Sequence, residues 1–226
     1  MVFAPRSSLP CPVRLNSCQL ICRQLGVEKV GPAPYAAIAT KIMVELKNQA
    51  FNQKMEHSMI KVGDTLPATT LMEFSEVEGN GCSIGPNAVD VAKATAGKTI
   101  ALFALPGAFT PTCSAKHVPS YVEKFSELKA AGVDEIWCVS VNDAFVMGAW
   151  ARDQNIGDKV RMLADGSADF TKATGLTLDL TARGMGLRSN RYSMLIRDGK
   201  VASLNVEAAG KFEVSDGATL LAQAKA

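Results

Sequence analysis

The sequence predicts an α/β protein with a mixed central sheet that carries helices on both faces. Residues 99–105 (TIALFAL) form a continuous apolar run, which is typical of a central strand buried on both sides. From residue 59 onward, such runs alternate with segments of helical periodicity, as they do in β-α-β units. Near the end, two apolar runs flank Asp198-Gly199, a dipeptide that favours a tight hairpin turn.

The first half of this domain follows from the strand at residues 99–105. Apolar residues at helical spacing predict a helix over residues 114–131, which Gly132 ends. Residues 135–141 (EIWCVSV) predict the next central strand. Asp143 is expected to cap the helix that comes after it.

The second half contains shorter elements. Residues 160–164 predict a strand and residues 167–174 a short helix. Residues 192–196 and 201–206 predict the two strands of the hairpin, and Ser215 is expected to cap a last helix. The order β-α-β-α-β-α-β-β-α, with a parallel start and an antiparallel end, is that of a thioredoxin-like fold.

Length and charge limit the possible partners. The 226 residues suit one domain with an extension, and 47% of them are hydrophobic, which is enough for a sizeable core. A net charge of +2 without clustered basic residues indicates neither nucleic acid nor an anionic membrane as a partner. No apolar stretch reaches the roughly 18 residues that a membrane span needs.

Residues 1–58 are predicted to be an N-terminal extension ahead of a domain at residues 59–226. No acidic residue precedes Glu28 in this extension, while arginines, serines and prolines recur. The composition resembles an organellar transit peptide. It is equally consistent with a dispensable leader before a later start at Met55 or Met59.

Within the extension, residues 1–34 are expected to be poorly ordered, and apolar spacing predicts a helix near residues 35–55. The expected location of the protein is the cytoplasm. The alternative is a mitochondrial or other organellar location, if residues 1–34 act as a transit peptide.

The cysteines indicate thiol chemistry rather than a disulfide framework. They lie at positions 11, 18, 22, 82, 113 and 138, and no pair has the C-x-x-C spacing. The two histidines, His57 and His117, are too few and too far apart to indicate a metal site. No metal and no cofactor are therefore expected.

The segment most informative about function is residues 106–113 (PGAFTPTC), at the carboxyl end of a central strand. Cys113 falls in the first turn of the next helix, where free N–H groups and the helix dipole favour a thiolate. Thr110 lies three residues earlier, so its hydroxyl can reach the sulfur or an attacking oxygen. A buried cysteine that only packs is the plainer interpretation. The threonine and the prolines that stiffen the loop, Pro106 and Pro111, instead favour the interpretation that Cys113 is a reactive thiol.

These residues resemble the active-site motif of the peroxiredoxins. PGAFTPTC and the later SVNDAFV are similar to the type II group, also called the peroxiredoxin V group, and the likeness covers residues 59–226. By this resemblance, Cys113 is the peroxidatic cysteine, Thr110 positions the peroxide and Pro106 shields the site.

The resemblance also implies an arginine from the last part of the sheet. It corresponds to Arg191 in the sequence RYSM, with Arg188 as the second candidate. A fixed positive charge there would stabilise the thiolate and the negative charge that develops on the leaving oxygen. His117, one helical turn after Cys113, either orients the site or makes a structural hydrogen bond.

The activity implied is that of a thiol peroxidase in antioxidant defence. Cys113 attacks hydrogen peroxide or an organic hydroperoxide and becomes a sulfenic acid, which external thiols reduce. The expected reductant is glutathione with glutaredoxin, or thioredoxin. A homodimer is also implied, and apolar residues expected to be exposed, namely Phe109, Phe145 and Val146, indicate its interface.

The sequence departs from the family pattern at the second cysteine. Residues 211–215 (KFEVS), where some members carry a resolving cysteine, contain none. Cys138, expected to be buried in a strand, and Cys82, in a Gly-rich loop, are the remaining candidates. The default is therefore a one-cysteine cycle with an external thiol, which is expected to reach the sulfenic acid of Cys113 where the site opens to solvent.

Two other functions use the same residues. A thiol–disulfide oxidoreductase would share the fold, but the absence of a C-x-x-C pair counts against it. A peroxide sensor or redox-relay protein would oxidise a partner protein instead of turning over with small thiols.

Overall fold

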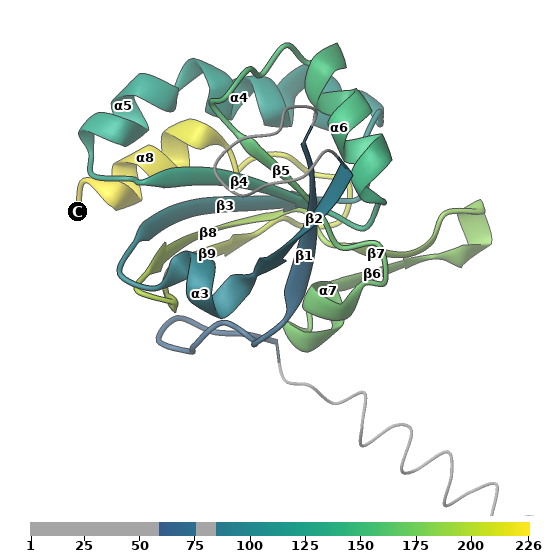
Figure 1. The fold of residues 1–226 in the computed structure, drawn as a ribbon, viewed down its shortest axis with the longest axis horizontal. Coiled ribbons are helices and arrows are strands. Elements are labelled where there is room, and N and C mark those ends of the chain that lie inside the picture. The colour runs from purple at the N-terminus through teal and green to yellow at the C-terminus, as the bar shows by residue number, and fades with distance from the viewer. Residues whose placement is uncertain (1–58, 76–84) are drawn as a thin grey trace, which may run out of the picture. The chain divides into compact units, whose positions relative to one another are not determined.

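The computed structural model describes residues 59–75 and 85–226. A seven-stranded sheet has the order β2-β1-β5-β4-β3-β8-β9 (Figure 1). Its strands are β1 (Thr70–Ser75), β2 (Gly85–Asp90), β3 (Thr99–Leu105), β4 (Glu135–Ser140), β5 (Arg161–Ala164), β8 (Tyr192–Arg197) and β9 (Lys200–Val206). Strands β3, β4 and β5 run parallel, whereas β8 is antiparallel to β3 and β9, which confirms the mixed sheet.

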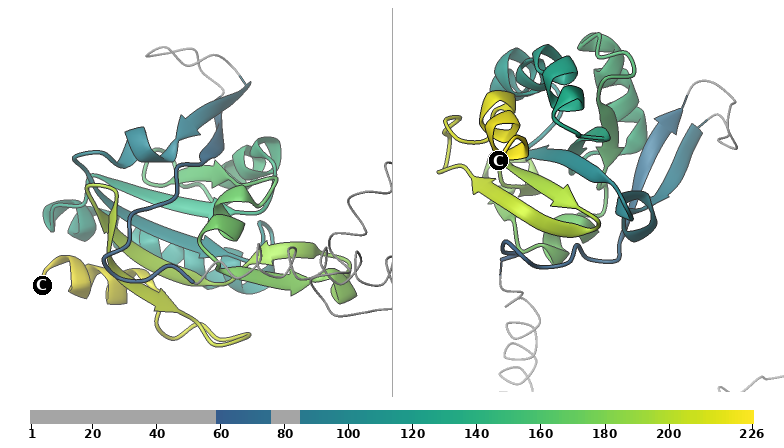
Figure 2. Two further views of the ribbon diagram at one scale, coloured as in Figure 1. Left: turned by 90° about the horizontal axis from the view of Figure 1, so that it is seen from below. Right: turned by 90° about the vertical axis from the view of Figure 1, so that its left-hand side faces the viewer.

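Helices cover both faces of the sheet, as expected (Figures 1 and 2). One face carries α4 (Val118–Glu123), α5 (Phe125–Ala130), α6 (Ala144–Asp153) and α8 (Gly217–Ala224), and the other carries α3 (Val91–Thr95) and α7 (Asp169–Ala173). Strand β3 is buried on both sides, with Phe103 in the first core and Leu102 in the second. None of the described helices has the length and apolarity needed to cross a bilayer.

The hairpin of β1 and β2 was not predicted from the sequence. It lies at the edge of the sheet, where β1 pairs antiparallel with β5. Only Val89 is buried in β2, so the apolar alternation on which a strand prediction depends is weak. Residues 1–58 and 76–84 lie outside the described residues, together with the expectations for the extension and for Cys82.

The helix expected over residues 114–131 lies where it was placed, but it is not continuous. A π-helical turn, η1 (Cys113–His117), leads into α4, and Lys124 (φ −89°, ψ 4°) separates α4 from α5. Pro119 has no N–H to donate to the preceding turn, which accounts for the irregular start.

The N-cap residue was predicted correctly for helix α6 but not for the last helix, α8. Asp143 caps α6 by accepting from the Val146 N–H at 2.9 Å, as expected. In α8 the cap is Asp216, whose carboxylate accepts from the N–H groups of Ala218 and Thr219 at 2.9 and 3.1 Å. Ser215, the residue expected there, is fully buried one position earlier.

A second hairpin, also not predicted, extends away from the main sheet (Figures 1 and 2). It consists of β6 (Thr177–Leu180) and β7 (Gly186–Ser189), joined through the short helix η2 (Thr181–Arg183). Its strands are too short and too exposed to show a clear apolar pattern. Strand β7 nevertheless matters for the site, because it carries Arg188 and leads to Arg191 and β8.

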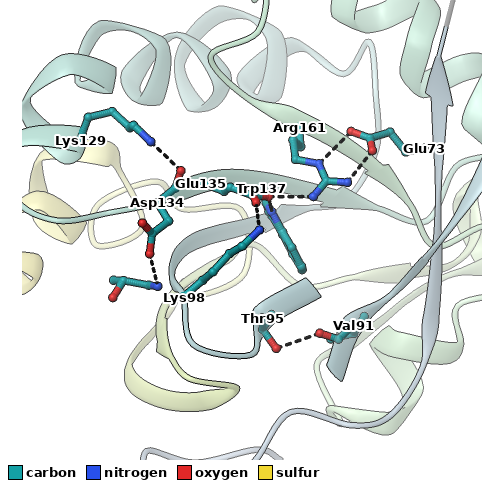
Figure 3. A network of polar contacts seen from close by, with 10 residues as sticks. Glu73, Val91, Thr95, Lys98, Lys129, Asp134, Glu135, Trp137 and Arg161 are labelled. Atoms are coloured by element: carbon teal, nitrogen blue, oxygen red, sulfur yellow. Dashed lines mark hydrogen bonds and ion pairs between the residues drawn. The ribbon is translucent and has the colours of Figure 1, made fainter. Parts of the chain in front are cut away.

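Charged side chains join β1, β4 and β5 across the sheet (Figure 3). Arg161 donates to both carboxylate oxygens of Glu73 at 3.0 and 2.6 Å and to Glu135 at 2.7 Å. Glu135 also pairs with Lys98 and accepts from the Trp137 indole at 2.8 Å. Burial opposes ionisation of Glu135, but these partners outweigh it and lower its pKa to about 2.

Candidate active site

The loop at residues 106–112 places Cys113 at the carboxyl end of β3. The helical backbone begins at Pro111, since the Ser114 N–H donates to the Thr110 carbonyl at 3.0 Å. Cys113 therefore lies in the first turn, as expected. The expectation that it opens to solvent is wrong for this conformation, because Cys113 is 0% exposed.

The loop is held by its own residues and by the next loop along the sheet edge. The Thr110 hydroxyl donates to the Gly107 carbonyl at 2.9 Å, so its proton is engaged within the loop. The Asn142 side-chain oxygen accepts from the Ala108 N–H at 3.0 Å and from the Ser140 hydroxyl at 2.7 Å. Asn142 was not singled out from the sequence, although it lies in the SVNDAFV segment.

Arg191 is the arginine that the structure brings to Cys113. Its Nη2 donates to the Cys113 Sγ at 3.5 Å, and its Nη1 contacts the His117 Nδ1 at 3.0 Å. The guanidinium carbon also lies 5.7 Å from the ring centroid of Phe212. These contacts fix the planar fork of Arg191 beside the sulfur.

His117 is neutral and holds Arg191 through a defined ring nitrogen. Its Nε2 lies 3.1 Å from the Ser215 carbonyl oxygen, which can only accept, so Nε2 carries the proton. Nδ1 then accepts from Arg191. Burial of the ring, together with the charge of Arg191, lowers the pKa of His117 to about 3.

Arg188, the second candidate, does not contact the sulfur and serves the loops instead. It donates from Nε to the Met185 carbonyl at 2.7 Å and from Nη1 to the Val141 carbonyl at 3.0 Å. A longer contact of 3.5 Å reaches the Pro106 carbonyl. Arg188 thus ties the projecting hairpin to the loops after β3 and β4.

Cys138 lies in β4 and is fully buried, as predicted. Burial raises the pKa of its thiol, and the neighbouring charge of Cys113 acts in the same direction. Such a thiol is a poor nucleophile in this conformation. Cys113 and Cys138 are both free within the described part of the chain.

The metal-binding side chains of the candidate site, Cys113 and His117, are not part of a larger cluster within the described residues. Among the described residues, no three His, Cys, Asp or Glu side chains lie close enough together to hold a metal ion. The groups that the structure places at this position are the thiol, the guanidinium and the surrounding hydrogen-bond donors.

Comparisons with known proteins show the family to which the chain belongs. The Redoxin family model matches residues 61–221. Peroxiredoxin-2B of Arabidopsis thaliana is 46% identical over 162 residues, which cover 72% of this chain and 96% of that protein. The chloroplastic Peroxiredoxin-2E-2 of Oryza sativa subsp. japonica is 48% identical over 165 residues, 72% of this chain and 71% of its own length.

A solved structure gives the same result. The crystal structure of reduced Prx3 in complex with H₂O₂ from Vibrio vulnificus is 50% identical and has a TM-score of 0.68, covering 74% of this chain and 99% of that one. A thioredoxin-like fold with a thiol at a helix start defines a thiol-dependent oxidoreductase. The chain belongs to the peroxiredoxins, in the type II group of the Redoxin family, and is a thiol peroxidase with an antioxidant function.

Proposed function

We propose that Cys113 is the peroxidatic cysteine and that Arg191 activates it. The observation that carries this proposal is the Arg191 Nη2 donor 3.5 Å from the Cys113 sulfur. A guanidinium keeps its charge at every physiological pH and stabilises a thiolate next to it. Among the described thiols, Cys138 has no such partner and is opposed by burial.

The reaction is a two-electron displacement on oxygen. The Cys113 thiolate attacks the terminal oxygen of hydrogen peroxide or an organic hydroperoxide, so an S–O bond forms and the O–O bond breaks. Water or an alcohol leaves after taking a proton, and Cys113 becomes a sulfenic acid. Arg191 and the backbone N–H groups of the first helical turn stabilise the negative charge on the departing oxygen.

Thr110 and Pro106 have supporting roles in this proposal. The Thr110 hydroxyl, which donates to Gly107 in this conformation, turns to position the peroxide when substrate enters. Pro106 begins the loop and shields the sulfur, with no N–H of its own to compete for the peroxide oxygens.

The proposed reductant is glutathione with glutaredoxin, and thioredoxin is the alternative. An external thiol is favoured because Cys138 is buried inside β4 with a raised thiol pKa. Cys113 is itself buried, so the loop at residues 106–112 has to move before any reductant reaches the sulfenic acid. Phe109, half-exposed with a φ of 58°, lies in the left-handed region where a bulky residue is strained, which marks it as the place for that movement.

The proposed protein partner is a second copy of this chain. Phe109, Phe145 and Val214 are exposed by 53%, 60% and 41%, whereas Val146 is partly buried, which is less exposed than expected. Phe109 and Phe145 follow the carboxyl ends of the adjacent parallel strands β3 and β4, and Val214 follows β9, which runs in the same direction at the end of the sheet beyond β8. A symmetric dimer would bury these apolar side chains on both subunits.

The cytoplasm remains the proposed location, with import into an organelle as the alternative. The rice relative is named as chloroplastic, whereas Peroxiredoxin-2B of Arabidopsis thaliana is not. Sequencing the N-terminus of protein purified from its own cells separates the two. Removal of about the first 34 residues would support import.

A turnover assay with varied reductants tests the proposed function. Purified protein is given hydrogen peroxide with glutathione and glutaredoxin, with thioredoxin and its reductase, or with no reductant. Continuous turnover with the first pair is expected. Consumption of a single equivalent of peroxide under every condition would instead support the sensor or redox-relay function.

A further inference from the structure

Glu207, which directly follows β9, organises the segment that lies over the candidate site. One of its carboxylate oxygens, Oε1, accepts four hydrogen bonds, from the N–H groups of Glu213, Val214 and Ser215 at 2.7, 2.8 and 2.9 Å and from the Ser215 hydroxyl at 2.8 Å. Burial alone would raise the pKa of Glu207, but these donors outweigh it and lower the pKa. The carboxylate is therefore ionised and its hydrogen bonds are charge-assisted.

The residue that Glu207 fixes is also the anchor of the site. Ser215 is fully buried, and its carbonyl oxygen accepts from the Tyr121 hydroxyl at 2.8 Å and from the His117 Nε2 at 3.1 Å. Phe212, in the same segment, places its ring 5.0 Å from the His117 ring. A shift of this segment would therefore move the His117 ring.

The position of the His117 ring in turn determines the position of Arg191 beside Cys113. Its Nδ1 contacts Arg191 at 3.0 Å, and Arg191 contacts the Cys113 sulfur at 3.5 Å. The guanidinium also lies over the Phe212 ring, with 5.7 Å between the guanidinium carbon and the ring centroid. The contacts form a continuous series from the carboxylate to the sulfur.

We propose that Glu207 is a positioning residue for the peroxidase reaction, which it supports by holding Arg191 in place through Ser215 and His117. The proposal rests on the proposed role of Cys113. Glu207 does not touch the reacting atoms, and its own negative charge opposes a thiolate. Its contribution must therefore come from geometry.

Because the charge of Glu207 and its positioning role have opposite effects on Cys113, the direction of the rate change on mutation distinguishes them. If Glu207 acted on Cys113 only through its charge, neutralising it would favour the thiolate and speed the reaction. If it acts by holding Arg191, removing the carboxylate slows the reaction, since misplacing a catalytic group costs rate. The two effects predict opposite changes.

The experiment compares Glu207→Ala, Glu207→Gln and the control Glu213→Gln in the full chain. Glu213 is an exposed acid in the same segment whose side chain pairs only with Lys211 among the contacts described. Two rates are measured: alkylation of Cys113 by iodoacetamide across pH, and single-turnover oxidation by hydrogen peroxide. Thermal unfolding checks that each variant is folded.

We expect Glu207→Ala to slow oxidation about tenfold and to move the alkylation profile to higher pH. Glu207→Gln keeps an acceptor oxygen without the charge, so its rate should fall about threefold. Glu213→Gln should match the unmodified protein. Should the alanine variant fail to fold, the glutamine variant decides: an unchanged or faster rate overturns the proposal.

A double variant separates positioning from general destabilisation. In an Arg191→Lys background, Glu207→Ala should add less than about a twofold loss, because the group that it positions is already gone. A full tenfold loss in that background would overturn the proposal. If Cys113→Ser retained turnover, the proposed function itself would fail. That outcome is distinct from an unchanged rate in the Glu207 variants, which would overturn only the positioning role.

Discussion

At the scale of single residues, the site pairs one buried thiol with one partly buried charge. Cys113 is fully buried, and Arg191 meets its sulfur from a different part of the chain, 78 residues further on. Because His117 is neutral, its contact with Arg191 fixes the guanidinium beside the sulfur without neutralising the guanidinium charge. If Cys113 is the attacking thiol, as proposed, its reactivity depends on how firmly Arg191 is held.

Arg191→Lys should slow oxidation of Cys113 by on the order of 10²-fold, the usual loss when one preorganised electrostatic group is removed. A lysine carries the charge but lacks the planar fork by which Arg191 contacts both His117 and Cys113. Stopped-flow measurement of the second-order rate checks this. Arg188→Lys is the control, and a larger loss in that variant would move the role to Arg188.

The neutral state of His117 predicts a pH dependence of stability. Its pKa is about 3 in the folded protein, below the ordinary value of about 6.5 in the unfolded chain. The folded state therefore binds fewer protons, and the contribution of His117 is lost as the pH falls from about 6.5 toward 3. Arg191, which opposes the imidazolium, and Glu207 and Asp216, which favour it, all act on this ring.

Urea unfolding from pH 7 to pH 4 measures this effect against His117→Gln, which cannot titrate. The free energy of unfolding should fall more steeply with acid in the unmodified protein than in the variant. Parallel curves for the two proteins would show that His117 does not titrate differently on unfolding.

The sequence predicted the local part of the site and missed the part built by the fold. Cys113 and Thr110 lie within four residues of each other, so a motif could place them. Glu207 and Ser215 reach the site across about 90 residues, mainly through backbone groups that carry no sequence signal. Asn142 was overlooked for a similar reason, since its partner is the Ala108 N–H.

At the scale of elements, the buried central strands were predicted from the sequence, whereas the strands of the two exposed hairpins were not. Strands β3 and β4 are central and apolar, and their pattern alone identified them. The hairpins β1–β2 and β6–β7 bury few side chains, and their strands were missed. Strand β1, next to the edge strand β2, is joined to β5 and β4 by ion pairs of Arg161 with Glu73 and Glu135.

Arg161→Met should lower the free energy of unfolding by about 1–3 kcal/mol, because Glu73 and Glu135 would lose a partly buried partner. Urea denaturation at neutral pH measures the change. Lys211→Met breaks an exposed pair and should change stability by less than about 0.5 kcal/mol. Equal losses in the two variants would show that burial of the network adds nothing.

At the scale of the whole molecule, the active-site edge is also the apolar edge. The segments after β3 and β4 carry Cys113, Phe109 and Phe145, and the segment after β9, a strand that runs in the same direction, carries Val214. A dimer formed there would cover the loop that has to move for reduction. Assembly and recycling are then coupled through residues 106–112.

Phe145→Glu should convert the proposed dimer to monomer, because it places a charge in the apolar contact on both subunits. Sedimentation velocity at tens of micromolar protein distinguishes the two states. Lys129→Glu, an exposed change on α5 away from this edge, is the control and should remain dimeric. A monomer in the unmodified protein would refute the dimer.

The assignment of Cys113 as the attacking thiol is tested most directly by trapping the sulfenic acid. Reduced protein is exposed to one equivalent of hydrogen peroxide in the presence of dimedone, and the labelled peptide is identified by mass spectrometry. We predict that the label is on Cys113 and that Cys113→Ser loses both the label and peroxide consumption while it remains folded. Labelling mainly at Cys138 or Cys82, or sustained turnover by Cys113→Ser, would contradict the assignment.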